Sequence, residues 1–228
     1  METRGNDSRE KEYLMKKLVL AACVVAAVVS FAESTPVMLS LFTPVQIPSS
    51  EYDVTGFRLS LLYGDCKNFK GLDIGVVDHT DGDFTGVQIG GVNVIDDRLL
   101  GGQIGLVNWN SSDVREWDKI STGAQIGLLN YAGSFCGLQG GIVNVTGDSF
   151  TGMQSGFFNL ARDMKGLQCG GACFGLIGVN VVSGSVRGCQ IGLLNYAEEM
   201  ECGLQIGIVN IISRNGWLPV LPIVNGHF

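Results

Sequence analysis

The chain has 228 residues, of which 46% are hydrophobic and only 16% are charged, and it contains 33 glycines. This composition excludes a charge-rich disordered protein, and the glycines lack the three-residue period of collagen. The net charge of −7, without a cluster of lysines and arginines, excludes an electrostatic nucleic-acid-binding surface, so we expect no nucleic-acid partner. The length suits one domain with a substantial core.

The first predicted element is an N-terminal export signal. Lys16-Lys17 precedes an uncharged apolar run over residues 18–31, which is short for a membrane span but typical of a signal peptide. We predict a signal peptide over residues 1–32, with residues 1–14 as an extended n-region. In a second interpretation the sequence ending at Cys23 is a lipobox, and Cys23 is acylated. Both interpretations predict an exported protein of the periplasm, outer membrane or cell surface.

Six cysteines remain after the predicted signal peptide. An even number in an exported chain permits disulfides, but six cysteines allow fifteen pairings and the sequence selects none of them. We favour the alternative that most of them are small apolar residues filling repeat positions. The six are Cys66, Cys136, Cys169, Cys173, Cys189 and Cys202.

A repeated unit of the form G-x-Q-I-G-L-x-N occupies the rest of the chain. Successive copies begin 14, 15 or 22 residues apart, and such a fixed period determines the architecture. The pattern predicts a single β-repeat domain over residues 33–228 with three related blocks, at about 56–122, 123–187 and 188–228 together with a strand at 36–46. The copies begin at Gly71, Gly86, Gly101, Gly123, Gly137, Gly152, Gly166, Gly188 and Gly203, with looser copies at Gly56 and Leu218.

Each copy has the period-two alternation of a β-strand and is bounded by turn residues such as Asp81-Gly82-Asp83. We therefore predict an all-β fold of about 12 short antiparallel strands, closed as a barrel or arranged as a prism. A β-solenoid with glutamine and asparagine ladders is the alternative. Glycine in the middle of a strand needs a reason, either tight curvature or close approach of neighbouring backbones.

An outer-membrane β-barrel is one alternative for the function. An even strand number, export and the terminal Phe228 favour it. Against it, the apolar stripe of positions 2, 4 and 6 spans roughly 13 Å, whereas such a barrel needs a band of about 25 Å. Pro219 and Pro222 also weaken a closing seam, because proline belongs on edge strands.

Few residues offer catalytic chemistry, and we predict no catalytic, cofactor-binding or metal-binding residue and no cofactor. The two histidines, His79 and His227, are scant material for a triad or a metal site. Gly171–Gly175 matches the G-x-C-x-G nucleophile pattern, so a thiol hydrolase or acyltransferase using Cys173 is a further alternative. The motif requires a strand–turn–helix context, and a glycine-rich repeat produces such matches by chance.

Two other groups of residues suggest ligands. Acidic turn residues could bind Ca²⁺ through oxygen atoms, although turns are commonly acidic for solvation; they are Asp81, Asp83, Asp96 and Asp97. The repeated glutamines could bind sugar hydroxyls, or they could form a cross-strand ladder, which we favour; they are Gln88, Gln103, Gln125, Gln139, Gln154, Gln168, Gln190 and Gln205. Trp109, Trp117 and Trp217 would suit contact with glycans or a membrane interface if they are exposed.

The GxQIGLxN units over about residues 36–228 resemble the glycine-rich surface-repeat proteins of bacteria, a largely uncharacterised family of exported envelope proteins. The unit at Gly166 departs from the pattern, as does the last unit with Pro222. The resemblance implies location rather than activity. We therefore expect a non-catalytic, exported cell-envelope or surface protein with a structural or binding role, whose partners are the cell envelope or outer membrane and surface glycans.

Overall fold

The computed structural model describes residues 34–112, 120–171 and 177–228. The predicted signal peptide, Trp117 and Cys173 lie outside these residues. The described part is all-β, as predicted, and contains no helix. Its strands are β1 (Ser34–Phe42), β2 (Val45–Ile47), β3 (Asp53–Cys66), β4 (Phe69–Thr80), β5 (Phe84–Ile95), β6 (Leu99–Ile104), β7 (Val107–Asn110), β8 (Ser121–Ile126), β9 (Leu129–Ala132), β10 (Phe135–Gly140), β11 (Val143–Gly156), β12 (Phe158–Gly170), β13 (Val179–Ile191), β14 (Leu194–Arg214) and β15 (Val220–His227).

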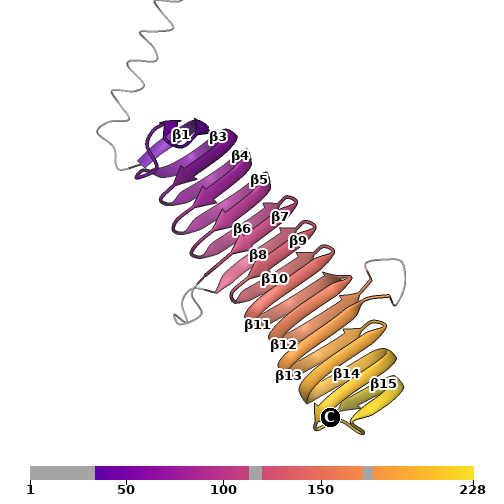
Figure 1. Cartoon of the computed structure of the whole chain (residues 1–228). Helices are drawn as coiled ribbons and strands as arrows, with labels where there is room; N and C mark the ends of the chain where they lie inside the picture. Colours follow the sequence, from indigo (N-terminus) through magenta and orange to yellow (C-terminus); the bar gives the residue numbers. More distant parts are fainter. Residues whose placement is uncertain (1–33, 113–119, 172–176) are drawn as a thin grey trace, which may run out of the picture.

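The chain coils into a β-solenoid of about eleven turns, seen in Figure 1 as a stack of strands along an elongated body. Neighbouring strands of successive turns are parallel, and equivalent repeat positions lie opposite one another, as Gly71 does with Gly86. The predicted antiparallel barrel or prism is therefore wrong, and the alternative β-solenoid is confirmed. A 15-residue period fits both a hairpin meander and one coil of a solenoid, so the period alone did not separate them.

Each turn has two strand segments separated by a bend. In the turn that starts at Leu99, β6 ends at Ile104 and β7 begins at Val107, so the bend is Gly105-Leu106. The Gln125 side chain in β8 donates a hydrogen bond of 3.0 Å to the carbonyl of Tyr131 in β9. One side chain thus spans the distance between the first and second segments, and the solenoid is a flattened coil with a thin interior.

The alternation is the reverse of a conventional amphipathic strand, because the glutamines and asparagines point inward while the aliphatic residues of the unit point outward. In β5, Gln88 and Asn93 are fully buried, whereas Val87 and Ile89 are exposed. Hydrophobic side chains fill the interior only at the start and end of each turn, as Phe84 and Ile95 do. Phe84 also stacks on Phe69 one turn earlier, with ring centroids 5.0 Å apart.

The first glycine of each unit is required by the close approach of neighbouring backbones, one of the two predicted reasons. Gly123 has a φ of 140°, in the region that side chains other than glycine rarely adopt. A Cβ at Gly123 would lie 1.7 Å from the carbonyl oxygen of Gly101 in the preceding turn. The repeat therefore selects glycine here through backbone packing.

Antiparallel strands cover both ends of the stack. At the N-terminal end, β2 pairs antiparallel with β1, so the strand predicted at 36–46 is a hairpin. At the C-terminal end, β15 pairs antiparallel with β14. Pro222 lies in β15, which is the terminal edge strand, where the missing N–H can be accommodated. Such caps prevent a repeat array from presenting a bare strand edge to other chains.

Candidate functional site

The buried glutamines form one continuous ladder along the solenoid. The Nε2 of each glutamine donates to the Oε1 of the glutamine one turn earlier, over distances of 2.7–3.0 Å, from Gln205 back to Gln88. All eight side chains are buried, at most 1% exposed. The predicted ladder is confirmed, and the alternative of glutamines that bind sugar hydroxyls is wrong because no ligand can reach them.

The buried asparagines form a second ladder with the opposite direction. The Nδ2 of each asparagine donates to the Oδ1 of the asparagine one turn later, over distances of 2.7–2.9 Å, from Asn93 to Asn210. The amide dipoles of the two ladders therefore point in opposite directions. At the N-terminal end the glutamine ladder presents a donor, and the asparagine ladder presents an acceptor.

A buried ion pair terminates the glutamine ladder. Gln88 donates to Asp73 over 3.1 Å, and Asp73 receives two hydrogen bonds from Arg58, of 2.7 Å from Nε and 2.5 Å from Nη2. Both charged side chains are fully buried. Burial opposes the charge on Arg58, but the hydrogen bonds and charge of Asp73 outweigh it and raise the arginine pKa above its usual value.

Asp78 occupies the asparagine position one turn before Asn93 and is fully buried. Neither of its carboxyl oxygens has a hydrogen-bond partner among the described residues, and the same is true of Asn93 Oδ1 and Ser60 Oγ. Burial, together with the negative charge of Asp73, raises the pKa of Asp78 to about 7. A protonated Asp78 would supply the donor that Asn93 Oδ1 lacks.

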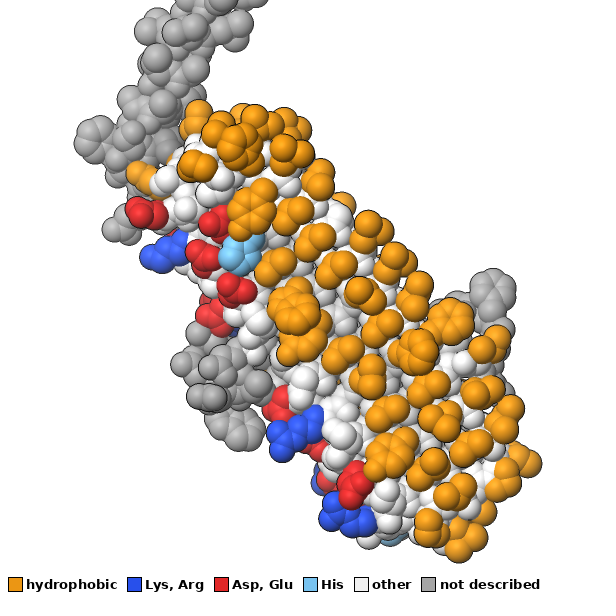
Figure 2. Space-filling view, in the orientation of Figure 1, with side chains coloured by type: hydrophobic (Ala, Val, Ile, Leu, Met, Phe, Trp, Pro, Cys, Tyr) orange, Lys and Arg blue, Asp and Glu red, His pale blue; other side chains and the backbone are white. Residues whose placement is uncertain are grey.

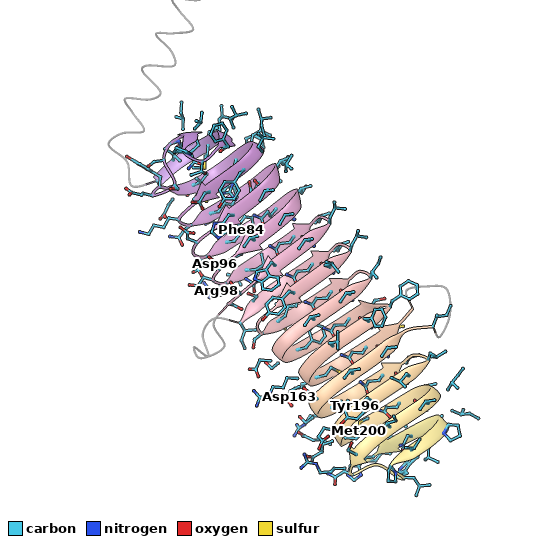
Figure 3. All side chains as sticks on the ribbon, viewed as in Figure 1. Phe84, Asp96, Arg98, Asp163, Tyr196 and Met200 are labelled. Carbon is cyan, nitrogen blue, oxygen red and sulfur yellow. The ribbon has the colours of Figure 1, made fainter. Side chains whose placement is uncertain are left out.

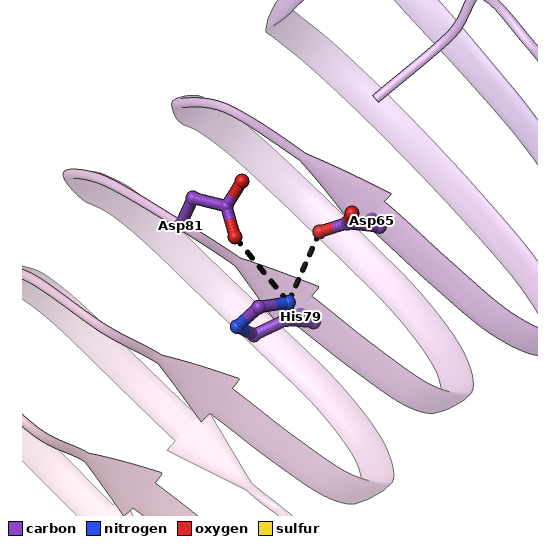
Figure 4. Close-up of side chains that lie close together, drawn as sticks. All are labelled: Asp65, His79 and Asp81. Carbon is purple, nitrogen blue, oxygen red and sulfur yellow. Dashed lines mark hydrogen bonds and ion pairs between the residues drawn. The ribbon is translucent and has the colours of Figure 1, made fainter. Parts of the chain in front are cut away.

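One cluster on the edge of the coil has metal-ligand character (Figure 4). His79 Nδ1 lies 3.0 Å from Asp65 Oδ1 and 3.5 Å from Asp81 Oδ1, and its Nε2 lies 3.1 Å from Asp96 Oδ2. The Nδ1 atom also lies 3.3 Å from the Tyr63 hydroxyl. Burial and the charge of Asp81 raise the pKa of Asp65. One imidazole and two carboxylates within 4.8 Å of one another could hold a divalent cation, but in this arrangement they bind one another.

The structure brings the predicted acidic turn residues to this same edge. Figure 3 labels one of them, Asp96, together with Arg98 and Asp163 on that edge. It divides them between two contacts: Asp81 and Asp96 bind His79, while Asp83 pairs with Arg98 over 3.4 Å. Asp97 accepts a hydrogen bond of 2.5 Å at its backbone carbonyl from Asn110. No shared oxygen cage for Ca²⁺ follows from these contacts.

The remaining predicted residues lie apart from this cluster. His227 is in β15 opposite Gly203, and Cys173 lies outside the described residues. Among the described cysteines five are free, namely Cys66, Cys136, Cys169, Cys189 and Cys202. Burial raises the pKa of the Cys66 thiol to about 11, so this cysteine is a poor nucleophile. Trp109 and Trp217 are exposed, as glycan contact would require.

The most extensive candidate site is the apolar exterior. Hydrophobic side chains cover most of the face in Figure 2, while charged side chains gather along one edge. We call the outward side chains of the second segments the second-segment face. Its members alternate with the buried residues of the same strands, and one of them is His79. The other members from β4 to β14 are Val77, Val92, Val94, Val107, Trp109, Leu129, Tyr131, Val143, Val145, Phe158, Leu160, Val179, Val181, Leu194, Tyr196, Val209 and Ile211.

Comparisons with known proteins give no relative. No family model, no curated protein and no solved structure matches the chain. Within the described ranges there is also no helix that is long and apolar enough to span a membrane. The resemblance to bacterial surface-repeat proteins therefore stays a prediction.

Arg58, Asp73 and Asp78 were not predicted from the sequence, although the aligned units contain a signal for them. Asp73 and Arg58 occupy the position that holds glutamine in the regular copies, and Asp78 occupies the asparagine position. Three charged residues at positions that are otherwise neutral amides mark the place where the two ladders end. The signal is readable only once these positions are known to point inward.

Proposed function

We propose that the protein is a non-catalytic, exported β-solenoid of the bacterial cell envelope that acts as a rigid scaffold and binds through its apolar exterior. The observation that carries this proposal is the second-segment face, which over nine turns of the described stack has no lysine, arginine, aspartate or glutamate and one histidine, His79. Monomeric soluble proteins rarely expose an apolar patch larger than about 300–600 Å² unless it serves binding.

The placement of the polar residues supports a non-catalytic role. The side chains that recur in the unit are glutamine and asparagine, and both are buried in ladders that no substrate reaches. The edge cluster around His79 consists of groups already bound to one another. Glycan contact through the exposed Trp109 and Trp217 remains compatible with this scaffold.

The test is fractionation of the full chain in a diderm bacterial host, with a matched variant in which Val24 and Val25 within the apolar run are replaced by aspartate. We expect the full chain in the envelope fraction with its N-terminus shortened, and the variant unprocessed in the cytoplasm. Recovery of the full chain as unprocessed cytoplasmic protein would overturn the proposed location. Competition by soluble glycans for envelope binding would identify the partner as carbohydrate.

A further inference from the structure

We propose that two copies of this chain pack face to face through the second-segment face, as an antiparallel two-fold dimer. This inference rests on the proposed function and names the partner of its binding surface. The first-segment face is less suited to the contact, because its outward residues include the charged side chains of Lys70, Lys165 and Arg187. From β4 to β14 the second-segment face has no lysine, arginine or carboxylate, and Asp65 of β3 extends one of its columns beside His79.

The area of the second-segment face matches the requirement of a stable dimer. Nine turns at about 4.8 Å per turn give a length of about 43 Å, and second segments of five residues give a width of about 16 Å. The product, roughly 700 Å² before side-chain relief is included, is close to the 800 Å² or so per partner of a standard interface. Interfaces between identical subunits are also more apolar than other protein surfaces.

The spacing of the rows fits a second copy. Outward side chains recur once per turn because equivalent positions stack in register, as Val107 does on Val92 and Leu129 on Val107. A second copy presents rows with the same spacing, so the two sets of side chains can interdigitate as in packed sheets. A partner without this period could not fill the grooves between successive rows over the whole length.

A stacked pair of aromatic residues lies near the middle of the face. Trp109 in β7 and Tyr131 in β9 stack with ring centroids 4.1 Å apart, near the middle of the strand order. A two-fold axis perpendicular to the solenoid at β11, the fifth of the nine turns, aligns the two faces over their full length and sets the aromatic pair of each copy against β12 and β13 of the other. Binding energy concentrates on tryptophan and tyrosine near the centre of interfaces.

Charge disfavours an anionic lipid surface as the occupant. Proteins that lie on such surfaces carry lysine and arginine beside the apolar face. This chain has a net charge of −7, and the edge beside the face carries the carboxylates around His79. A neutral bilayer would lack this repulsion and is therefore an arm of the test.

The test is sedimentation equilibrium of the full chain purified from the exporting host. The test variant Leu129→Lys/Phe158→Lys places two charges on the second-segment face, where the side chains are 47% and 49% exposed. The matched control Ile126→Lys/Leu138→Lys places two charges on first-segment positions that are 54% and 55% exposed. We expect a dimer for the wild type and the control, and at least a 100-fold higher dissociation constant for the test variant.

A second pair of variants tests the aromatic centre. Trp109→Ala should raise the dissociation constant at least 10-fold, whereas Trp217→Ala, which removes an exposed tryptophan beyond β14, should leave it unchanged. Far-UV circular dichroism establishes that every variant is folded. Equal effects of the two alanine variants, or of the two lysine pairs, would overturn the proposed interface.

A monomeric wild type also overturns the dimer, and vesicle binding then tests the proposed function separately. If the monomer floats with phosphatidylcholine vesicles and the Leu129→Lys/Phe158→Lys variant does not, the face binds neutral lipid and the scaffold function stands. If the monomer binds neither vesicles nor envelope fractions, both proposals fail.

Discussion

Equivalent interior positions hold chemically different side chains in the first repeat turns and in the later turns. From Gln88 to Gln205 the interior carries neutral amides, whereas the turns of β3 and β4 carry Arg58, Asp73 and Asp78. An amide ladder has a direction, so its two ends need different partners. The glutamine ladder ends in a donor that bonds the carboxylate of Asp73, while the asparagine ladder ends in an acceptor, Asn93 Oδ1, in register with Asp78, whose pKa is raised. The two terminating carboxyl groups differ accordingly: Asp73 is paired with Arg58, whereas burial and the charge of Asp73 raise the pKa of Asp78.

Removal of the terminal carboxylate should have the largest effect. Asp73→Asn leaves the buried Arg58 without its counterion, and we expect a loss of about 3–5 kcal/mol in the free energy of unfolding. Urea denaturation followed by circular dichroism measures it. Asp148→Asn, which breaks the exposed pair with Arg162, is the control and should cost less than about 1 kcal/mol. The double variant Arg58→Gln/Asp73→Gln extends the neutral ladder and should recover most of the loss; failure to recover would contradict this account.

The buried Asp78 should make stability depend on pH. Its folded pKa of about 7 lies above the unfolded value of about 3.9, so the folded state holds the proton more tightly. Stability is therefore highest below pH 4 as far as this group is concerned, and it falls as the pH rises to 7, by roughly 4 kcal/mol.

The variant Asp78→Asn isolates that contribution, because asparagine supplies the missing donor to Asn93 without titrating. We expect it to be more stable than the wild type at pH 8 and to lack the fall between pH 4 and pH 7, as measured by thermal unfolding across the pH range. An unchanged pH profile would show that Asp78 is not the titrating group.

The later turns should be most sensitive at their closest backbone contacts. Gly123→Ala forces a Cβ against the Gly101 carbonyl at an unfavourable φ, and we expect a loss of about 3 kcal/mol. Gly140 is the matched control, because a Cβ there would meet nothing within 4 Å. Gly140→Ala should be neutral or stabilising by up to about 1 kcal/mol. Similar melting temperatures for both variants would contradict the close-packing explanation.

The smallest effect distinguishes the middle of the ladder from its end. Gln139→Leu removes the oxygen that accepts from Gln154 and Thr146 and leaves Gln125 Oε1 without its donor, and it should cost about 2–3 kcal/mol. Gln205→Leu removes the bonds that Nε2 donates to Gln190 and to the Ile211 carbonyl but no bond at Oε1, which has no partner among the described residues, and should cost about 1 kcal/mol. Equal losses in urea denaturation would indicate that the ladder bonds act independently of their position.

The sequence predicted the strands, the repeat and the glycine contacts, but not the direction of the alternation. Ile89 and Gln88 alternate equally well with either residue inside, and hydrophobicity favours the isoleucine. The interior holds Gln88 instead, because stacked amides satisfy one another once strands are parallel and in register. That compensation depends on contacts 15 residues apart, which no local pattern contains.

The candidate sites show the same division between local and long-range information. The acidic turns were visible in the sequence, but the pairing of Asp65 with His79 depends on the stacking of β3 on β4. Likewise the second-segment face follows from the repeat only after the inward positions are known. The terminating role of Asp78 depends on both ladder directions, which are properties of the whole stack.

The stacking of one repeat per turn of the solenoid has a mechanical consequence. A turn such as Gly71 to Gly86 contains 15 residues, whose extended contour is about 50 Å, yet it advances the solenoid by only about 4.8 Å. Tension applied to the two ends along the solenoid axis acts on the turns in series, so they detach from the stack one at a time. Each turn that is released extends to about ten times its rise in the folded solenoid. An anchored molecule of this kind would act as an extensible tether that yields in steps.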